Sequence, residues 1–291
     1  MLGIGLVAFL GISTLPLLGN LFQGNDAPAG APTEQAATSA QQAELASQVK
    51  GYEMVLQREP ENQTALRGLL EARLEMIRLQ LADVQTVIEP LEKLVKLNPD
   101  RADYAVLLAQ AKQYSGNREG AAQTYRNVLK TQPGNVNALQ GLVTLFLEEQ
   151  RPEAAIGLLE DTLKSANQAN QIQPGSVDVT SVRLELGRVY MAQSRFDDAL
   201  KVYERAIEGD SGDFRPVLAK GMVLQEQGKA DEAKPFFDKA LELAPPQFKD
   251  QIKQRMAATP GTGTDLPALP APDSPPAVDV PTSSPSEATD E

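Results

Sequence analysis

The chain has 291 residues, contains no histidine, cysteine or tryptophan, and carries a formal net charge of −12. It therefore has no thiolate nucleophile, disulfide, cysteine–histidine zinc site or serine–histidine–aspartate relay. Because it also lacks a glycine-rich phosphate loop, an Asp-x-Asp calcium loop and a basic stripe, we expect no enzymatic site, metal, cofactor, small-molecule substrate or nucleic-acid partner.

The first segment, residues 1–22, contains an uncharged run from Leu2 to Phe22. About 20 apolar residues suffice to cross a bilayer, so this run predicts a single transmembrane helix that anchors the chain. The alternative is a secretory signal, which has a shorter apolar core, a basic flank and a small-residue cleavage site. The anchor is favoured, because no lysine or arginine precedes Lys50 and a proline interrupts Ala27-Pro28-Ala29.

Residues 23–43 consist mainly of alanine, glycine, proline, threonine and glutamine, with few large apolar side chains. This composition predicts a flexible linker between the anchor and the folded part of the chain. We expect that folded part to span residues 44–258. Its first stretch, Glu44–Pro60, has the apolar spacing and closing proline of a second helix that lacks its first.

A pattern with a period of 34 residues dominates the rest of the chain. Leu186-Gly187 recurs as Lys220-Gly221, Asp198-Ala199 as Glu232-Ala233, Tyr203 as Phe237, and Ala206 as Ala240. Prolines end successive helix-like runs in the same register, at positions 99, 133 and 245. Small residues share one position, and large apolar residues follow four later on the same helix face. These pairs are Ala121 and Tyr125, Ala155 and Leu159, Ala199 and Tyr203, and Ala233 and Phe237.

These residues, in this order and at this period, resemble the tetratricopeptide repeat. The resemblance implies an all-α, right-handed superhelical solenoid of helix–turn–helix pairs, with about five repeats over residues 44–258. A five-residue insertion falls around Glu75–Asp83, and a longer one at 168–179 predicts an extended helix end followed by a loop that bulges from the array. Residues 248–258 are expected to form a capping helix with a polar outer face.

In stacked repeats of this kind the first helix of each pair lines a concave groove, which receives a protein partner. Repeat positions 2, 5, 9 and 12 of that helix face inward. From these positions we selected seven candidate partner-binding residues: Arg67, Asp103, Gln110, Asn137, Gln140, Arg188 and Arg215. Arg188 and Arg215 are candidates to pair with carboxylates of a bound segment, the alternative being ordinary solvated arginines.

Residues 259–291 hold eight prolines and six carboxylates but no lysine or arginine. This composition predicts a disordered tail that keeps the chain soluble. A short binding motif within the tail is the alternative. End units of repeat arrays also self-associate in some cases, and Phe236 and Phe248 are the candidates for such a contact.

The last repeat carries a narrower resemblance, to the Slow Green type of chloroplast proteins and their cyanobacterial relatives. The matching residues are Gly212-Asp213-Phe214-Arg215-Pro216, Lys220-Gly221-Met222, Glu232-Ala233 and Ala244-Pro245-Pro246. The resemblance implies an assembly factor for photosynthetic membrane complexes, anchored in a thylakoid or plasma membrane with its repeats in the stroma or cytoplasm. The alternative is a secreted or periplasmic repeat protein that serves envelope or polysaccharide assembly.

Overall fold

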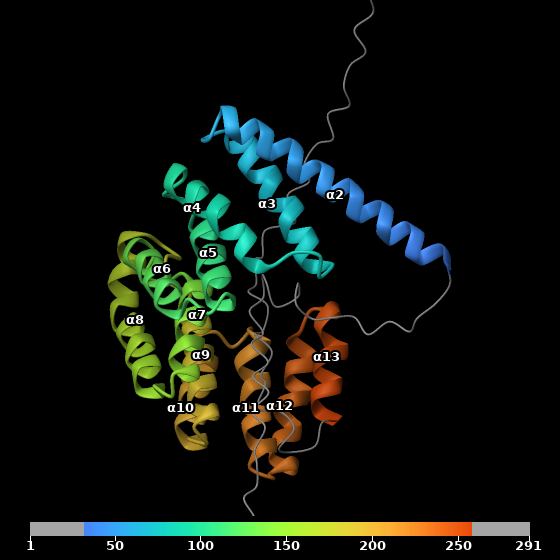
Figure 1. Cartoon of the computed structure of the whole chain (residues 1–291). Coiled ribbons are helices and arrows are strands. Elements are labelled where there is room, and N and C mark those ends of the chain that lie inside the picture. Colours follow the sequence, from blue (N-terminus) through green and yellow to red (C-terminus); the bar gives the residue numbers. More distant parts are fainter. Residues whose placement is uncertain (1–31, 258–291) are drawn as a thin grey trace, which may run out of the picture.

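The computed structural model describes residues 32–257, with side chains from residue 41 onward. Twelve α-helices and one short 3-10 helix, η1, make up this part of the chain, and it contains no β-strand (Figure 1). The elements are α2 (Pro32–Arg58), α3 (Gln63–Arg78), η1 (Val84–Val87), α4 (Ile88–Leu97), α5 (Ala102–Tyr114), α6 (Arg118–Thr131), α7 (Val136–Glu148), α8 (Pro152–Ile172), α9 (Val179–Ala192), α10 (Phe196–Gly209), α11 (Phe214–Glu226), α12 (Ala230–Leu243) and α13 (Pro246–Ala257).

The helices begin and end at residues suited to those positions. Asparagine or aspartate side chains cap the N-termini of α3, α6, α7, α9 and α11. At the turn inside each helix pair, one residue adopts a left-handed backbone conformation that reverses the chain. These residues are Gln80, Gly116, Gln150, Ser194 and Gly228. A common turn thus recurs in every pair, although only two of its five members are glycine.

The pairing of helices produces a curved array. Each first helix from α5 onward contacts the next one: α5 contacts α7, α7 contacts α9, and α9 contacts α11. Among the described helices, the second members of the pairs, α6, α8, α10 and α12, make no such contact with one another. The first helices therefore lie on the inside of the curve and the second helices on the outside, with α6 and α8 at the outer edge (Figure 1). The predicted all-α solenoid is confirmed.

The repeated small and large residues build the core between units. The alanines of the shared position are at most 1% exposed, and the large residues four later are at most 3% exposed. The tyrosine rings fit against glycines of neighbouring first helices. A Cβ atom on Gly187 would lie 2.2 Å from the ring of Tyr203, and one on Gly141 would lie 2.2 Å from the ring of Tyr125. Glycine at these sites therefore permits the close approach of the helices.

The linker expected over residues 23–43 is wrong from Pro32 onward, where α2 begins. Proline is favoured in the first turn of a helix, and the alanine, glutamine and glutamate residues that follow are good helix formers. The C-terminal half of α2 also packs on α3, with Leu45 buried and the ring of Tyr52 against Gly68. Packing on α3 thus extends the ordered array toward the N-terminus.

The transmembrane anchor predicted for residues 1–22 and the tail predicted for 259–291 both lie outside the described residues. Within residues 32–257, no helix has the length and apolar character needed to span a bilayer.

The insertion at 168–179 does not bulge away as a loop. α8 continues to Ile172, and the following turn folds back onto the array. The side chain of Asn170 bonds both the N–H and the carbonyl of Val177 at 2.9 Å. Val177, which is 2% exposed, also forms a parallel bridge with Gly134 of the preceding repeat. Because these groups are satisfied within the protein, the turn is held to its neighbour and does not project over the groove.

At the C-terminal end, α13 closes the array. The Phe248 ring stacks on Phe214 with centroids 5.3 Å apart, and Ile252 is buried. Phe236, the other candidate for self-association, lies beneath the ammonium of Lys220 at 4.6 Å. Both aromatic side chains thus make contacts within their own chain.

Candidate protein-binding groove

The inner face of α5 can be located from its ion pairs. Lys112 extends from α5 to Glu92 of α4, a second helix, at 2.9 Å. Two positions along a helix are 200° apart, so Gln110 lies on nearly the opposite side of α5, facing the inside of the curve. The inner faces of α5, α7, α9 and α11 form one continuous surface, since each of these helices contacts the next. We call this surface the groove.

The structure brings six of the seven predicted residues onto the helices of the groove and separates the seventh. Asp103 and Asn137 are exposed, Gln140 and Arg188 are half-buried, and Gln110 and Arg215 are buried. Arg67 is exposed on α3, but η1 contacts both α3 and α5, and α3 makes no contact with α5. The insertion in the first repeat thus detaches Arg67 from the groove.

Arg215 is not the exposed carboxylate receptor that its repeat position predicted. Its side chain is 8% exposed and pairs with the 10%-exposed carboxylate of Asp213 at 2.6 Å. A second guanidinium nitrogen donates to the hydroxyl of Ser181 in the preceding repeat at 3.1 Å. Arg215 therefore joins the start of α11 to the start of α9, and its charge is neutralised inside the protein.

Arg188 also has an internal counter-ion, the buried carboxylate of Glu185 one turn earlier on α9. At the other end of the groove, both oxygens of Asp103 accept from Arg101, at 2.9 and 2.7 Å. This hydrogen-bonded pair lowers the pKa of Asp103, against the opposing effect of its partial burial. The charged residues of the groove are thus mostly paired, so recognition of a partner falls to neutral polar groups.

The neutral groups stand out on α5. Gln110 is 1% exposed, yet neither its amide nitrogen nor its amide oxygen has a hydrogen-bond partner among the described residues. Gln113 donates to Glu148 of α7 at 3.2 Å, while its buried oxygen has no donor there. A buried amide without partners costs about 1–3 kcal/mol. Repeat position predicted that Gln110 faces the groove, but it gave no indication that the amide is buried and unsatisfied.

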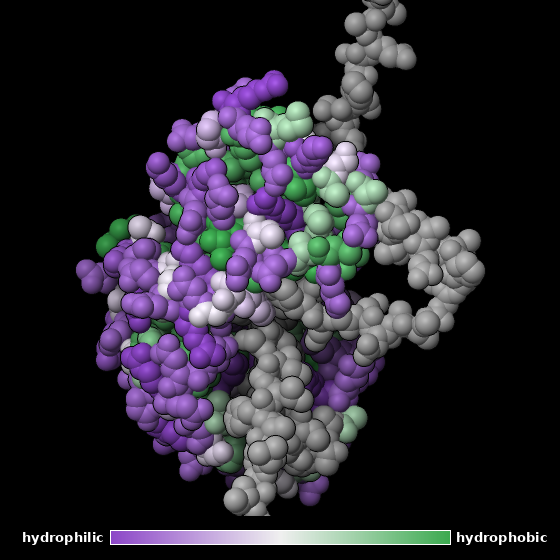
Figure 2. All heavy atoms as spheres, viewed as in Figure 1, coloured by the Kyte–Doolittle hydropathy of each residue, from purple (hydrophilic) through white to green (hydrophobic). Residues whose placement is uncertain are grey.

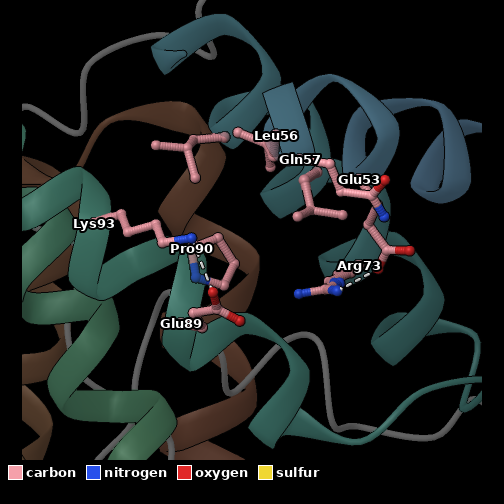
Figure 3. A pocket seen from close by; sticks show the side chains of 9 residues that line it. Glu53, Leu56, Gln57, Arg73, Glu89, Pro90 and Lys93 are labelled. Atoms are coloured by element: carbon pink, nitrogen blue, oxygen red, sulfur yellow. Dashed lines mark hydrogen bonds and ion pairs between the residues drawn. The ribbon is translucent and has the colours of Figure 1, made fainter. Parts of the chain in front are cut away.

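A separate cavity of about 290 Å³ lies between α2, α3 and α4, away from the groove (Figure 3). Its apolar lining comes from Leu56, Leu66, Leu69 and Pro90. Ion pairs border it on both sides: Arg73 to Glu53 at 2.7 Å, and Lys93 to Glu89 at 2.8 Å. The Lys93 bond lowers the pKa of Glu89. The sequence analysis missed this cavity, because it depends on α2 and η1, which the repeat pattern does not describe.

The outer helices present a solvated surface. Figure 2 shows hydrophilic residues over most of the visible face formed by α6 and α8. In residues 32–257 no group of aspartate and glutamate side chains is arranged to hold a metal ion. The groove is therefore the extended feature that recurs through the array.

Comparison with known proteins places this architecture. The pattern of the tetratricopeptide repeat matches residues 113–174 and 184–248. SLOW GREEN 1, chloroplastic, from Arabidopsis thaliana is 29% identical over 206 residues, which cover 71% of this chain and 62% of that protein. Cellulose synthase operon protein C from Pseudomonas fluorescens (strain SBW25) is 26% identical over 153 residues, 52% of this chain and 12% of that protein.

Among solved structures, yeast Tom70 superposes with a TM-score of 0.51 at 13% identity, over 72% of this chain and 42% of that chain. At this identity the likeness is one of fold alone. The chain spans less than two thirds of the length of each of these relatives.

Proposed function

We propose, from the premise that this chain is a tetratricopeptide-repeat protein resembling Slow Green 1, that it holds a segment of a client protein in its groove. The observation that carries the proposal is the continuous inner face from α5 to α11. A pre-formed concave surface of this kind binds through many weak contacts, because little ordering is required when the partner enters. The repeat architecture thus supports a scaffold for protein–protein interaction.

We further propose that the chain is membrane-anchored through residues 1–22 and serves as an assembly factor for complexes of a photosynthetic membrane. Two observations support this finer proposal. The first is the identity to a chloroplast protein over 71% of the chain, and the second is the uncharged run at the N-terminus. Under this proposal the repeats face the stroma or cytoplasm.

The second candidate is a secreted or periplasmic protein of polysaccharide assembly. The match to cellulose synthase operon protein C favours it, over 12% of that protein. Mass spectrometry of the mature N-terminus separates the two candidates. An intact segment 1–22 supports the anchor, and a new start between residues 29 and 36 supports secretion.

The groove itself is tested by co-purification from a photosynthetic bacterium with a tagged full chain. The test variant is Asn137→Arg with Gln140→Arg on the inner face of α7. The matched control is Gln123→Arg with Asn127→Arg, which places the same charges on exposed positions of α6. We expect the partners of the wild-type chain to be lost only with the α7 variant. Partners that survive it, or that are lost equally with the α6 variant, would contradict groove binding.

A further inference from the structure

The described part of the chain ends beside the groove. α13 packs back on α11, the last of the groove-lining helices, through the stacking of Phe248 on Phe214. Near the end of α13, the carbonyl of Met256 accepts from the side chain of Gln225 on α11 at 3.3 Å. Gln225 occupies an inward-facing repeat position. The chain that follows Ala257 therefore starts at the C-terminal end of the groove.

The groove offers hydrogen-bonding capacity that the described residues do not use. Both amide atoms of Gln110 and the amide oxygen of Gln113 are buried without partners on α5. The amide oxygen of Gln227, just after α11, is in the same condition. A glutamine amide can donate to a backbone carbonyl and accept from a backbone N–H, so these groups are suited to an extended peptide.

Residues 259–291 have the composition and length of such an occupant. With eight prolines among 33 residues, the sequence favours an extended backbone whose carbonyls are not used within the segment. At about 3.1 Å per residue, the segment spans about 100 Å. Packed helices are about 8–10 Å apart, so the path from α11 to α5 is about 30 Å. The segment is therefore long enough to cross the groove several times over.

We propose that residues 259–291 occupy the groove of their own chain, with backbone groups meeting the amides of Gln110 and Gln113. A client protein must then displace this segment, so the tail competes for the site. This inference rests on the proposed function of the groove and adds its regulation.

The experiment uses the full chain with one nitroxide label. Ser274→Cys provides a unique attachment point, because the chain has no native cysteine. Methyl resonances then report which helices the label approaches. We expect Leu184, on the inner helix α9, to lose most of its intensity, and Leu163, on the outer helix α8, to keep it. Adding Gln110→Leu should restore the Leu184 intensity, whereas the matched outer-face change Gln123→Leu should not.

A urea melt of the Gln110→Leu chain checks that it folds. It should be at least as stable as the wild type, since an unsatisfied amide is replaced by an apolar group of similar shape. Mixing labelled chains with unlabelled, isotope-enriched chains distinguishes a tail in its own groove from one in a second copy.

Two results would overturn the inference. One is an unchanged Leu184 signal in the labelled chain, and the other is equal loss at Leu184 and Leu163. Neither result touches the scaffold proposal, which depends on client capture by the same full chain. If the α7 variant loses its partners while the label reports no tail in the groove, the scaffold stands and the competing tail does not.

Discussion

The buried pair of Arg215 and Asp213 permits a quantitative test of how the last repeats are joined. Replacing Arg215 with methionine leaves the Asp213 carboxylate 10% exposed and without its counter-ion. Removing one partner of a buried pair costs about 3–5 kcal/mol. We expect about 3 kcal/mol here, since Asp213 still caps α11 by accepting from the Arg215 backbone N–H at 2.9 Å, and that bond survives the substitution.

The assay is urea unfolding followed by far-ultraviolet circular dichroism. The double variant Arg215→Met with Asp213→Asn removes the stranded charge and retains a capping side chain, so it should recover about 2 kcal/mol. The control is Lys164→Met, which breaks the exposed pair with Asp161 and should cost less than about 1 kcal/mol. If Arg215→Met costs no more than Lys164→Met, or if the double variant recovers nothing, the pair does not join the repeats as described.

Two further predictions concern glycine packing and the edge of the groove. Gly187→Ala should cost about 1–3 kcal/mol in urea unfolding, because its Cβ would overlap the Tyr203 ring. Gly157→Ala, with open space around it, should instead gain about 0.5–1 kcal/mol, and equal effects would contradict the packing. Arg101→Gln should raise the pKa of Asp103 in a carboxyl-carbon NMR titration. Because that pKa is lowered in the folded state, the pair stabilises the fold above pH of about 4 and is lost on acidification. An unchanged titration midpoint would refute this role of Arg101.

The period of 34 residues was enough to predict the helix pairs and their core. Ala199 and Tyr203 form the core contacts that their spacing indicated, because small and large residues at fixed helical positions leave few ways to pack. The turns were less visible. Gln150 and Ser194 adopt the left-handed conformation that Gly116 and Gly228 adopt elsewhere, and nothing in their identity indicates it.

The candidate site was predicted as a set of positions but not as an environment. Repeat position could not show that Arg215 is buried, since its partners are Asp213 and a serine 34 residues earlier. Nor could it show that η1 separates α3 from α5 and detaches Arg67, because an insertion in sequence does not reveal where the inserted residues pack. These features depend on contacts between units, and the period describes only what the units share.

The most direct test of the central claim, that the inner face is the binding surface, is site-specific photo-crosslinking in the full chain. A benzophenone amino acid replaces Gln140 on α7 in one version and Gln123 on α6 in the other. The account predicts that the version at position 140 forms a crosslinked product with a partner protein, and that the version at 123 does not. Crosslinks from position 123 alone, or from both positions equally, would contradict it.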